Sequence, residues 1–275
     1  MKLEDVILRG TRSDQPDATD VPEGSLYYVT DESVIERSNG TTWDTYSSSG
    51  GLICIQRITA TGAYVYTPTT GTVFIIVELQ GAGGGGGGVA SPGGTDCALA
   101  GGGQGGGWLR KLISDSALFS GATGSVGAGG AGGAAGNNAG AAGGNTTFVD
   151  TAATTYTAGG GDPGAGTAGL GPTPKLRVPA RAGGVCTNGD DSQSGWPGST
   201  ALALGTAQAL GAFGGNSKYG QGGYQSSIGA INTSLAGGNA LGKGAGGGGA
   251  AALGTGVAAA GGNGSDGIVI IWEFQ

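Results

Sequence analysis

Residues 74–88 read FIIVELQGAGGGGGG, and this stretch decides the fold, because a strand-forming run passes directly into six consecutive glycines. Residues 72–80 are rich in β-branched and aliphatic side chains, which predicts a strand. The expected buried face of that strand consists of Val73, Ile75, Val77 and Leu79. The glycines have no side chains to bury, and glycine loses more conformational freedom on folding than any other residue. An ordered glycine run must therefore be held through its backbone.

Other strands accompany this one. Residues 52–57 and 63–67 carry the same β character, and the chain ends on a further strand over 268–274 in which Ile268, Ile270, Trp272 and Phe274 alternate. We expect this last strand to pair with residues 72–80, so that the ends of the domain meet. Residues 81–265 then form an insertion between two paired strands.

The insertion holds 59 of the 67 glycines in this chain of 275 residues. They come in bursts, of which the densest are 83–88, 101–107, 159–161 and 246–249. A spacing of three residues is explicit in one place, at Gly121, Gly124, Gly127, Gly130, Gly133 and Gly136. Three residues per turn is the repeat of the polyproline II helix. This spacing favours extended three-fold helices over the insertion.

Such helices have no internal hydrogen bonds, so an isolated one leaves its backbone to water. If several lie side by side, each N–H and C=O can reach a neighbouring helix, and only glycine allows so close an approach. Collagen is excluded, because it needs an unbroken Gly-X-Y register and abundant proline, and this chain has 9 prolines. We predict a mainly β and irregular fold without substantial α-helix: a strand framework, at about 52–80 and 267–274, that encloses a bundle of polyglycine helices at 81–265.

Residues 1–50 have a different composition, with ten acidic and four basic side chains, and we expect them to form a separate domain. Strands are predicted at 25–30, 34–38 and 41–46, which would form a meander. Asn39-Gly40 predicts a two-residue hairpin turn, whose favoured type needs positive φ at both residues. Residues 14–23 are rich in Asp, Pro and Thr and predict an exposed connector.

This meander has few side chains to bury, too few to offset the backbone entropy of ordering about twenty residues. Two interpretations remain open. Either the domain assembles with further copies of itself, or it packs against the domain that follows it in the same chain.

The composition bears on several classes of function. Only 11% of residues are charged and the net charge is −7, so the chain lacks the basic surface that a nucleic acid requires. Its longest uncharged stretch, 116–149, is mostly Gly, Ala, Asn and Thr, and we expect no membrane insertion. Histidine is absent, which removes the commonest general base and every Ser-His or Cys-His arrangement. We expect no enzyme and no cofactor.

Some local patterns are weak signals. Residues 127–132 match the dinucleotide pattern GxGxxG, but this glycine content produces such matches by chance. Residues 237–244, GGNALGKG, approach a phosphate loop, yet Gly244 replaces the Ser or Thr that would bind magnesium. Neither pattern predicts a nucleotide site.

Carboxylates and thiols offer little more. Asp190 and Asp191, with Asp162 elsewhere, could act as a pair in polysaccharide cleavage, and Asn188, Asp190 and Ser192 could join a calcium site. A solvated turn explains these residues better than catalysis or metal binding does. Cys97 and Cys186 could pair, but free thiols are the favoured state.

Aromatic side chains beside amides and hydroxyls interrupt the glycine bursts, and such groups suit both sugar stacking and protein contacts. The candidate receptor-binding residues are Trp196, Phe213, Lys218, Tyr219, Gln221 and Tyr224. The alternative is that these side chains fill gaps between the helices.

Several motifs together carry a resemblance. They are FIIVELQGAGGGGGG at 74–88, GGGWLRK at 105–111, GAGGAGG at 127–133 and DGIVIIW at 266–272. In this combination the chain resembles the glycine-rich domain of bacteriophage tail-fibre and adhesin proteins. GSLYYVTD at 24–31 with RSNGTTW at 37–43 resembles a short β module of phage fibres.

The resemblance implies a homotrimeric virion appendage, assembled in the host cytoplasm. Its first 50 residues would attach to other virion proteins or trimerise, and loops on the polyglycine bundle would contact a bacterial surface glycan or outer-membrane protein. One alternative is a purely structural head or tail fibre without receptor contact. A remoter one is an ice-binding protein, since flat bundles of glycine-rich helices can present a regular face.

Overall fold

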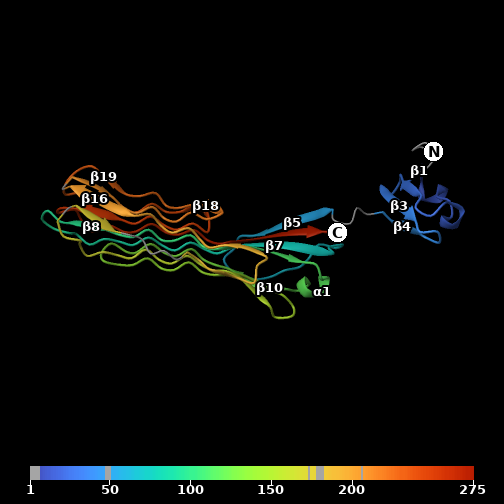
Figure 1. Cartoon of the computed structure of the whole chain (residues 1–275), viewed down its shortest axis with the longest axis horizontal. Coiled ribbons are helices and arrows are strands. Elements are labelled where there is room, and N and C mark those ends of the chain that lie inside the picture. Colours follow the sequence, from blue (N-terminus) through green and yellow to red (C-terminus); the bar gives the residue numbers. More distant parts are fainter. Residues whose placement is uncertain (1–6, 47–50, 173, 178–182, 206) are drawn as a thin grey trace. The chain divides into compact units, whose positions relative to one another are not determined.

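The computed structural model describes residues 7–46, 51–172, 174–177, 183–205 and 207–275. It divides into two compact units, one of Met1–Ile53 with Phe274–Gln275 and one of Cys54–Glu273. Figure 1 shows the strands of both units and the long irregular segments of the second. Each unit is described by itself below.

The first unit is built on a four-stranded sheet of order β1-β2-β3-β4. Its strands are β1 (Ile7–Gly10), β2 (Leu26–Val29), β3 (Val34–Ser38) and β4 (Trp43–Thr45). The last three form the predicted antiparallel meander, whereas β1, which pairs with β2 in parallel, was not predicted. The 3-10 helix η3 (Ala18–Asp20) lies in the expected connector, and η2 (Arg12–Asp14) ends where that connector begins. Ala18 is buried there, so this connector is only partly exposed.

The predicted two-residue turn at Asn39-Gly40 is wrong in its detail. Gly40 has a φ of +88°, but Asn39 is not among the residues with positive φ. Ser38 pairs with Trp43, which leaves a four-residue connection. The reason is the Asn39 side chain, whose Oδ1 accepts hydrogen bonds from the backbone N–H groups of Thr41 and Thr42 at 3.0 and 2.9 Å. These bonds stabilise a wider turn.

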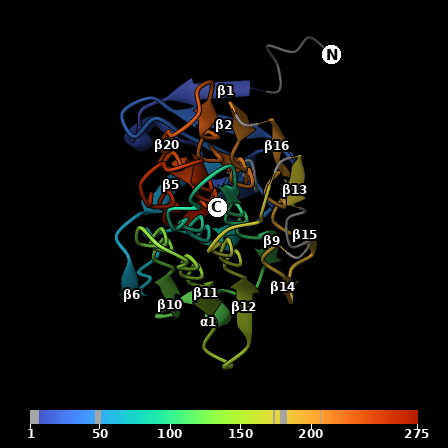
Figure 2. The ribbon, with the colours of Figure 1, turned by 90° about the vertical axis from the view of Figure 1, so that its left-hand side faces the viewer.

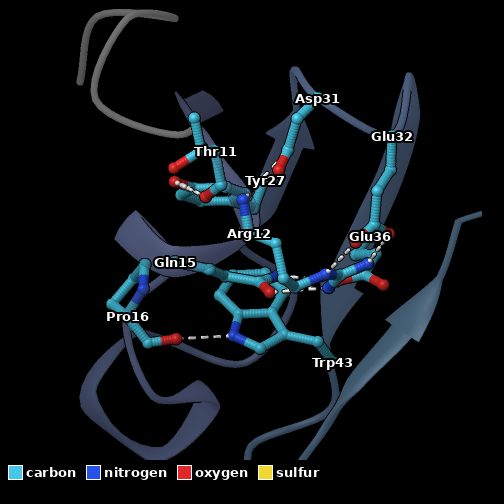
Figure 3. Close-up of polar contacts among 9 residues, drawn as sticks. All are labelled: Thr11, Arg12, Gln15, Pro16, Tyr27, Asp31, Glu32, Glu36 and Trp43. Atoms are coloured by element: carbon cyan, nitrogen blue, oxygen red, sulfur yellow. Dashed lines mark hydrogen bonds and ion pairs between the residues drawn. The ribbon is translucent and has the colours of Figure 1, made fainter.

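A polar cluster around Arg12 joins η2 to the sheet (Figure 3). Its guanidinium donates to Glu32 and, at 2.7 Å, to Glu36 Oε2, while Gln15 Nε2 also donates to Glu36 at 2.6 Å. Glu36 is 6% exposed, so its carboxylate depends on these donors. The hydrogen bond from Arg12, together with the one from Gln15, holds the pKa of Glu36 below its ordinary value.

The second unit begins and ends on a sandwich of two five-stranded sheets. One has the order β15-β9-β7-β23-β5 and the other β14-β12-β11-β10-β6. The first sheet comprises β5 (Leu52–Ile58), β7 (Phe74–Gln80), β9 (Trp108–Ile113), β15 (Asp191–Gln193) and β23 (Ile268–Phe274). The second comprises β6 (Gly62–Val65), β10 (Thr123–Val126), β11 (Thr146–Val149), β12 (Thr155–Ala158) and β14 (Cys186–Thr187). β7 and β23 are hydrogen-bonded neighbours, which confirms their predicted pairing.

The core of the sandwich lies between these sheets, and it includes Ile75, Val77 and Leu79 of β7. Val73 precedes the strand and is 56% exposed, contrary to expectation. In β23 the side chains that join the core are Val269 and Ile271, not the alternating set that begins at Ile268. Both faces of β23 are covered over its first four residues, since Ile268 and Ile270 are buried as well as Val269 and Ile271, so alternation does not identify the core face.

The glycine-rich segments run as extended rods from this sandwich toward a second group of sheets. Residues 81–90 form the rod that follows β7. From Gly81 to Val89 its N–H groups donate in a strict rotation of three to 101–107, 138–144 and 259–265. Their carbonyls accept mainly from three other segments: 130–136, 161–167 and 247–250. The rod therefore has six neighbouring segments. Figure 2 views the bundle end-on, with teal coils among green, yellow, orange and red ones. This is the predicted polyglycine bundle.

Three inner rods, 81–90, 101–107 and 244–250, also bond to one another. Gly84 N–H donates to Gln104 O, Gly103 N–H to Gly247 O, and Gly247 N–H to Gly84 O, at 2.8–2.9 Å. A Cβ at Gly84, Gly103 or Gly247 would lie closer than 3.0 Å to a neighbouring backbone. None of these glycines has a positive φ. Glycine is required in the inner rods because of close approach, and the left-handed region plays no part.

The rod at 127–134 lies at the surface and explains the spacing of three. Gly127, Gly130 and Gly133 are buried, whereas the alanines at 128, 131 and 134 are exposed. One face of each turn contacts neighbouring rods and another meets solvent. Gly121 and Gly124, in contrast, do not belong to a rod: Gly121 lies in a turn with a φ of +85°, and Gly124 lies in β10 against Tyr64.

Short sheets close the far end of the bundle. One has the order β13-β16-β17-β19 and another β20-β22-β8, with small and aliphatic side chains packed between them. The strands are β8 (Cys97–Leu99), β13 (Lys175–Arg177), β16 (Ala201–Gly205), β17 (Gln208–Leu210), β19 (Ser227–Ile228), β20 (Ser234–Leu235) and β22 (Ala251–Leu253). We call this group the distal cap; in Figure 1 its labels β8, β16 and β19 lie at the opposite end of the unit from β7.

The remaining elements are few. β18 (Tyr219–Gln221) pairs with β21 (Leu241–Lys243), and the one α-helix of the described residues is α1 (Ser116–Phe119), a single turn. The fold is thus mainly β and irregular, as predicted. Among the described residues, no helix has the length and apolarity needed to cross a membrane.

Substitution of one inner glycine tests the bundle directly. A Cβ at Gly85 would meet the backbone of Ala131, so we expect Gly85→Ala to lower the free energy of unfolding by about 1–3 kcal/mol, the usual range for overpacking. Gly169 has no positive φ, and a Cβ there would meet nothing within 4 Å. Gly169→Ala should be neutral or stabilise by up to about 1 kcal/mol. Calorimetry of both full-length variants measures the difference, and equal melting temperatures would contradict the close-packed bundle.

The Glu36 carboxylate makes the first unit sensitive to acid. Its pKa is lowered in the folded state, so its contribution is present above the unfolded pKa, about 4.3, and is lost as the pH falls through the folded value. Glu32 has a lowered pKa for the same reason and acts in the same direction. We therefore expect Glu36→Gln to reduce stability at pH 7 and to weaken its decrease in acid.

The NMR resonance of Trp43, which lies in β4, can follow the unfolding of the first unit. In chain labelled with 5-fluorotryptophan, the ¹⁹F resonance of Trp43, assigned with Trp43→Phe, follows the unfolding of the unit against temperature and pH. The exposed Asp20→Asn removes one negative charge outside the cluster and serves as the control. The interpretation is wrong if Glu36→Gln and Asp20→Asn have the same pH profile.

Candidate functional site

Half of the predicted receptor-binding residues meet on the flank of the bundle. Trp196, Phe213 and Gln221 line one hollow of about 350 Å³, together with Ser199 and Asn216. We call this hollow the flank groove. Trp196 is 56% exposed and Phe213 43% exposed, so neither aromatic ring fills a gap inside the bundle.

Two antiparallel rods place these side chains. Trp196 N–H donates to Asn216 O at 3.4 Å, and Ser199 N–H donates to Phe213 O at 3.0 Å. Because each rod repeats every three residues, Trp196 and Ser199 share one face of their rod, and Phe213 and Asn216 share one face of the next. The groove therefore combines side chains that the chain order separates.

The polar groups of the groove are oriented by the backbone around them. Asn216 Oδ1 accepts from Gly222 N–H at 2.8 Å, which directs the amide of Asn216, and Ser199 Oγ accepts from Phe213 N–H at 2.8 Å. Gln221 is exposed at the end of β18. The groove thus offers two aromatic faces, two amides and a hydroxyl, with no charged residue in its lining.

Lys218 and Tyr219 lie elsewhere, where the bundle meets the sandwich. Lys218 Nζ is 3.5 Å from the ring centroid of Trp108 and 3.5 Å from Glu78 Oε2. The Tyr219 hydroxyl donates to the same carboxylate, and burial together with this bond raises the pKa of the phenol. These contacts hold both side chains against the sandwich and outside the flank groove, with Lys218 exposed and Tyr219 half-buried.

Tyr224 is 65% exposed on a neighbouring rod, and its ring lies against Gly238, where a Cβ would collide with it. Tyr224 does not line the flank groove. Of the six candidates, three therefore share the groove, two join the base of the bundle and one lies alone.

The distal cap carries an apolar surface that the sequence did not reveal. Exposed aliphatic side chains occur on several of its strands and connections: Leu176 at 60%, Leu204 at 62%, Ile231 at 45%, Leu235 at 43% and Val257 at 71%. A hollow of about 290 Å³ lies between β16, β17 and β19 and is lined by Leu202, Leu204, Leu210 and Ile228, among others. These residues look unremarkable in sequence, and only the return of the chain to the same end brings them together.

Asp190 is held by β9 through both of its carboxylate oxygens. Asp190 Oδ1 accepts from Lys111 Nζ at 2.6 Å and Asp190 Oδ2 from Leu112 N–H at 2.8 Å, and these bonds lower the pKa of Asp190. A carboxyl group with a lowered pKa is a poor proton donor at neutral pH. Asp191 and Ser192 belong to β15, and Asn188, with a φ of +65°, donates to Thr155 O.

The two glycine motifs and the cysteines have structural positions in the fold. Residues 127–132 lie within a surface rod, and residues 237–244 include β21 (Leu241–Lys243). The three cysteines are free, with Cys97 in the distal cap and Cys186 in the sandwich. Among the described residues, no group of three or more His, Cys, Asp or Glu side chains could hold a metal ion.

Glycine rods that run between a strand sandwich and a distal cap define the class of this protein as glycine-rich, β-framed and held through its backbone. The family model of the glycine-rich domain matches residues 59–272, and the chain belongs to this family. A comparison with curated proteins finds no match.

The contacts of Lys218 predict that its substitution lowers the stability of the protein and leaves the flank groove unchanged. We expect Lys218→Ala to lower the free energy of unfolding by about 1 kcal/mol, because it removes the cation–π contact with Trp108. Gln221→Ala, at an exposed position of the groove, should leave the melting temperature unchanged. Thermal unfolding followed by circular dichroism measures both. A destabilisation by Gln221→Ala as large as that by Lys218→Ala would contradict this division of roles.

Proposed function

We propose that this protein is a non-enzymatic virion protein, a bacteriophage tail-fibre or receptor-binding appendage that presents the end of its bundle to a bacterial surface. The resemblance of its motifs to phage fibre proteins supports the class. The observation that carries the receptor role is the aliphatic cluster on the distal cap, where Leu176 and Leu210 pair with Leu202 across β13, β16 and β17, and Leu204 lines the same hollow. Exposed apolar patches are typical of interaction sites.

The bundle suits such a role mechanically. Each rod is bonded to its neighbours along its whole length, and a three-fold helix rises about 3.1 Å per residue, so few residues hold the cap far from the sandwich. The connections in the cap can differ in length and sequence without disturbing the rods, because the rods interact through backbone groups. A receptor-binding surface can therefore change while its support stays the same.

The first unit would attach the chain to other virion proteins and form a homotrimer. Tyr28 and Ile35 are directly paired across β2 and β3 and are 37% and 43% exposed, and Tyr46 nearby is 51% exposed. An apolar face on so small a sheet suits burial against further copies. In this proposal the protein is assembled in the bacterial cytoplasm and resides in the virion.

Cell binding by the full-length protein tests the proposal. Fluorescently labelled chain is incubated with a panel of bacterial strains, and we expect it to bind some of them. Leu204→Glu and Val257→Glu, at exposed positions of the cap, should reduce that binding about tenfold or more, as buried charges do at interface centres. Val65→Glu, 69% exposed on β6 in the sandwich, is the matched control.

Two results would contradict receptor binding: no strain is bound, or the cap variants bind as well as the control. The second candidate function, a purely structural fibre, then follows if antibodies against the chain label phage particles in electron micrographs. Particles that carry no label, from cells that express the gene, would exclude both functions.

A further inference from the structure

The flank groove, defined above by Trp196, Ser199, Phe213, Asn216 and Gln221, has a chemistry unlike that of the distal cap. We propose that it binds a neutral oligosaccharide, by stacking sugar rings on Trp196 and Phe213. This inference rests on the proposed function, because it supplies a second contact with the bacterial surface, and it names the chemistry of that contact. The groove is independent of the aliphatic cluster in position and composition.

The spacing of the two aromatic residues follows from the rods. Trp196 lies level with Asn216, and Phe213 is one turn away along the same rod. One turn of three residues is about 9 Å at about 3.1 Å per residue. Two exposed rings at this spacing, on adjacent rods, can stack on separate units of one short oligosaccharide. An aromatic face also pairs well with the apolar face of a sugar ring.

The polar groups complete the recognition. Because Gly222 N–H occupies Oδ1 of Asn216, the Nδ2 group of this amide is oriented to donate. Gln221 contributes a second exposed amide, with both a donor and an acceptor. The Ser199 hydroxyl on the opposite rod donates to Thr200 O and accepts from Phe213 N–H, so it has one acceptor position left for a ligand. Amides and hydroxyls that flank an aromatic face match the alternating hydroxyls of a sugar.

The groove is also largely formed before a ligand arrives. Gly105 N–H donates to Trp196 O at 2.9 Å, Gly215 N–H to Gly103 O at 2.8 Å and Gly223 N–H to Gly246 O at 2.8 Å. Each of the three rods that line the groove is therefore tied to an inner rod of the bundle. Little backbone ordering remains to be done on binding, which favours affinity for a small ligand.

Charge and size separate this ligand from the alternatives. The lining holds no charged residue in a chain of net charge −7, so it offers nothing to attract a sulfated or phosphorylated sugar. A volume of about 350 Å³ lies in the range of small-ligand sites. A stable protein interface needs about 800 Å² on each partner, which a hollow between two or three rods does not supply.

The full-length protein is titrated with maltotriose, cellotriose and chitotriose as neutral probes and with a sulfated heparin trisaccharide as the charged one. Isothermal calorimetry measures binding, and the fluorescence of Trp196 follows it, identified by its loss in Trp196→Phe. We expect at least one neutral probe to bind and the sulfated probe not to bind. Trp196→Ala and Gln221→Ala should each weaken that binding about tenfold or more.

Tyr224→Ala is the matched control, since it removes an exposed aromatic ring outside the groove, and Lys218→Ala controls for lost stability. Both should keep the affinity of the parent chain. The proposal is overturned if no neutral probe binds, if the sulfated probe binds equally well, or if Trp196→Ala binds like Tyr224→Ala. Melting curves of each variant confirm that it is folded.

The outcome separates this proposal from the proposed function. Should the chain bind cells through its cap while Trp196→Ala binds every sugar probe unchanged, the groove inference fails alone. Should a sugar bind in the groove while no bacterial strain is bound, receptor presentation fails and a carbohydrate-binding chain remains.

Discussion

The hydrogen bond between backbone groups of neighbouring rods is the interaction on which this protein depends. In an α-helix or a sheet, backbone bonds point along the axis or to two sides, and side chains fill the remaining space. In the inner rods here, successive N–H groups point to three different neighbours, so the space that side chains would use is occupied by other backbones. A single methyl group at such a position meets a carbonyl oxygen, and glycine becomes a requirement of packing.

The bundle needs an apolar core at each end, because rods without side chains bury little apolar surface of their own. The sandwich provides closure on one side, through a core that joins β7 and β23, the strands that precede the first rod and follow the last. The distal cap provides it on the other, with small side chains such as Ala203, Ala209 and Ala251. We expect the bundle to fold cooperatively, since each inner rod shares its hydrogen bonds with several segments that are distant in the chain.

Two surfaces of different chemistry arise from this construction. The strands and connections of the cap bring aliphatic residues to the end of the bundle, which suits binding to an apolar receptor surface. The flank exposes aromatic rings and amides at intervals set by the three-residue turn, which suits a chain of sugar units. The rods serve both surfaces in the same way, because their rigidity comes from backbone bonds and leaves outward-facing side chains free to vary.

Much of this architecture was determined by the sequence alone. The passage from a β-rich strand into six glycines, and the matching strand at 268–274, predicted a framework around a glycine bundle, because these patterns depend on local periodicity and on the absence of Cβ atoms. The tertiary structure alone decided which rods are inner ones, that Trp196 and Phe213 share a groove while Lys218 and Tyr219 join Glu78, and that the cap is aliphatic. The physical reason is that lateral neighbours in the bundle are chosen by long-range backbone bonds, and a glycine run carries no side chains that specify its partners.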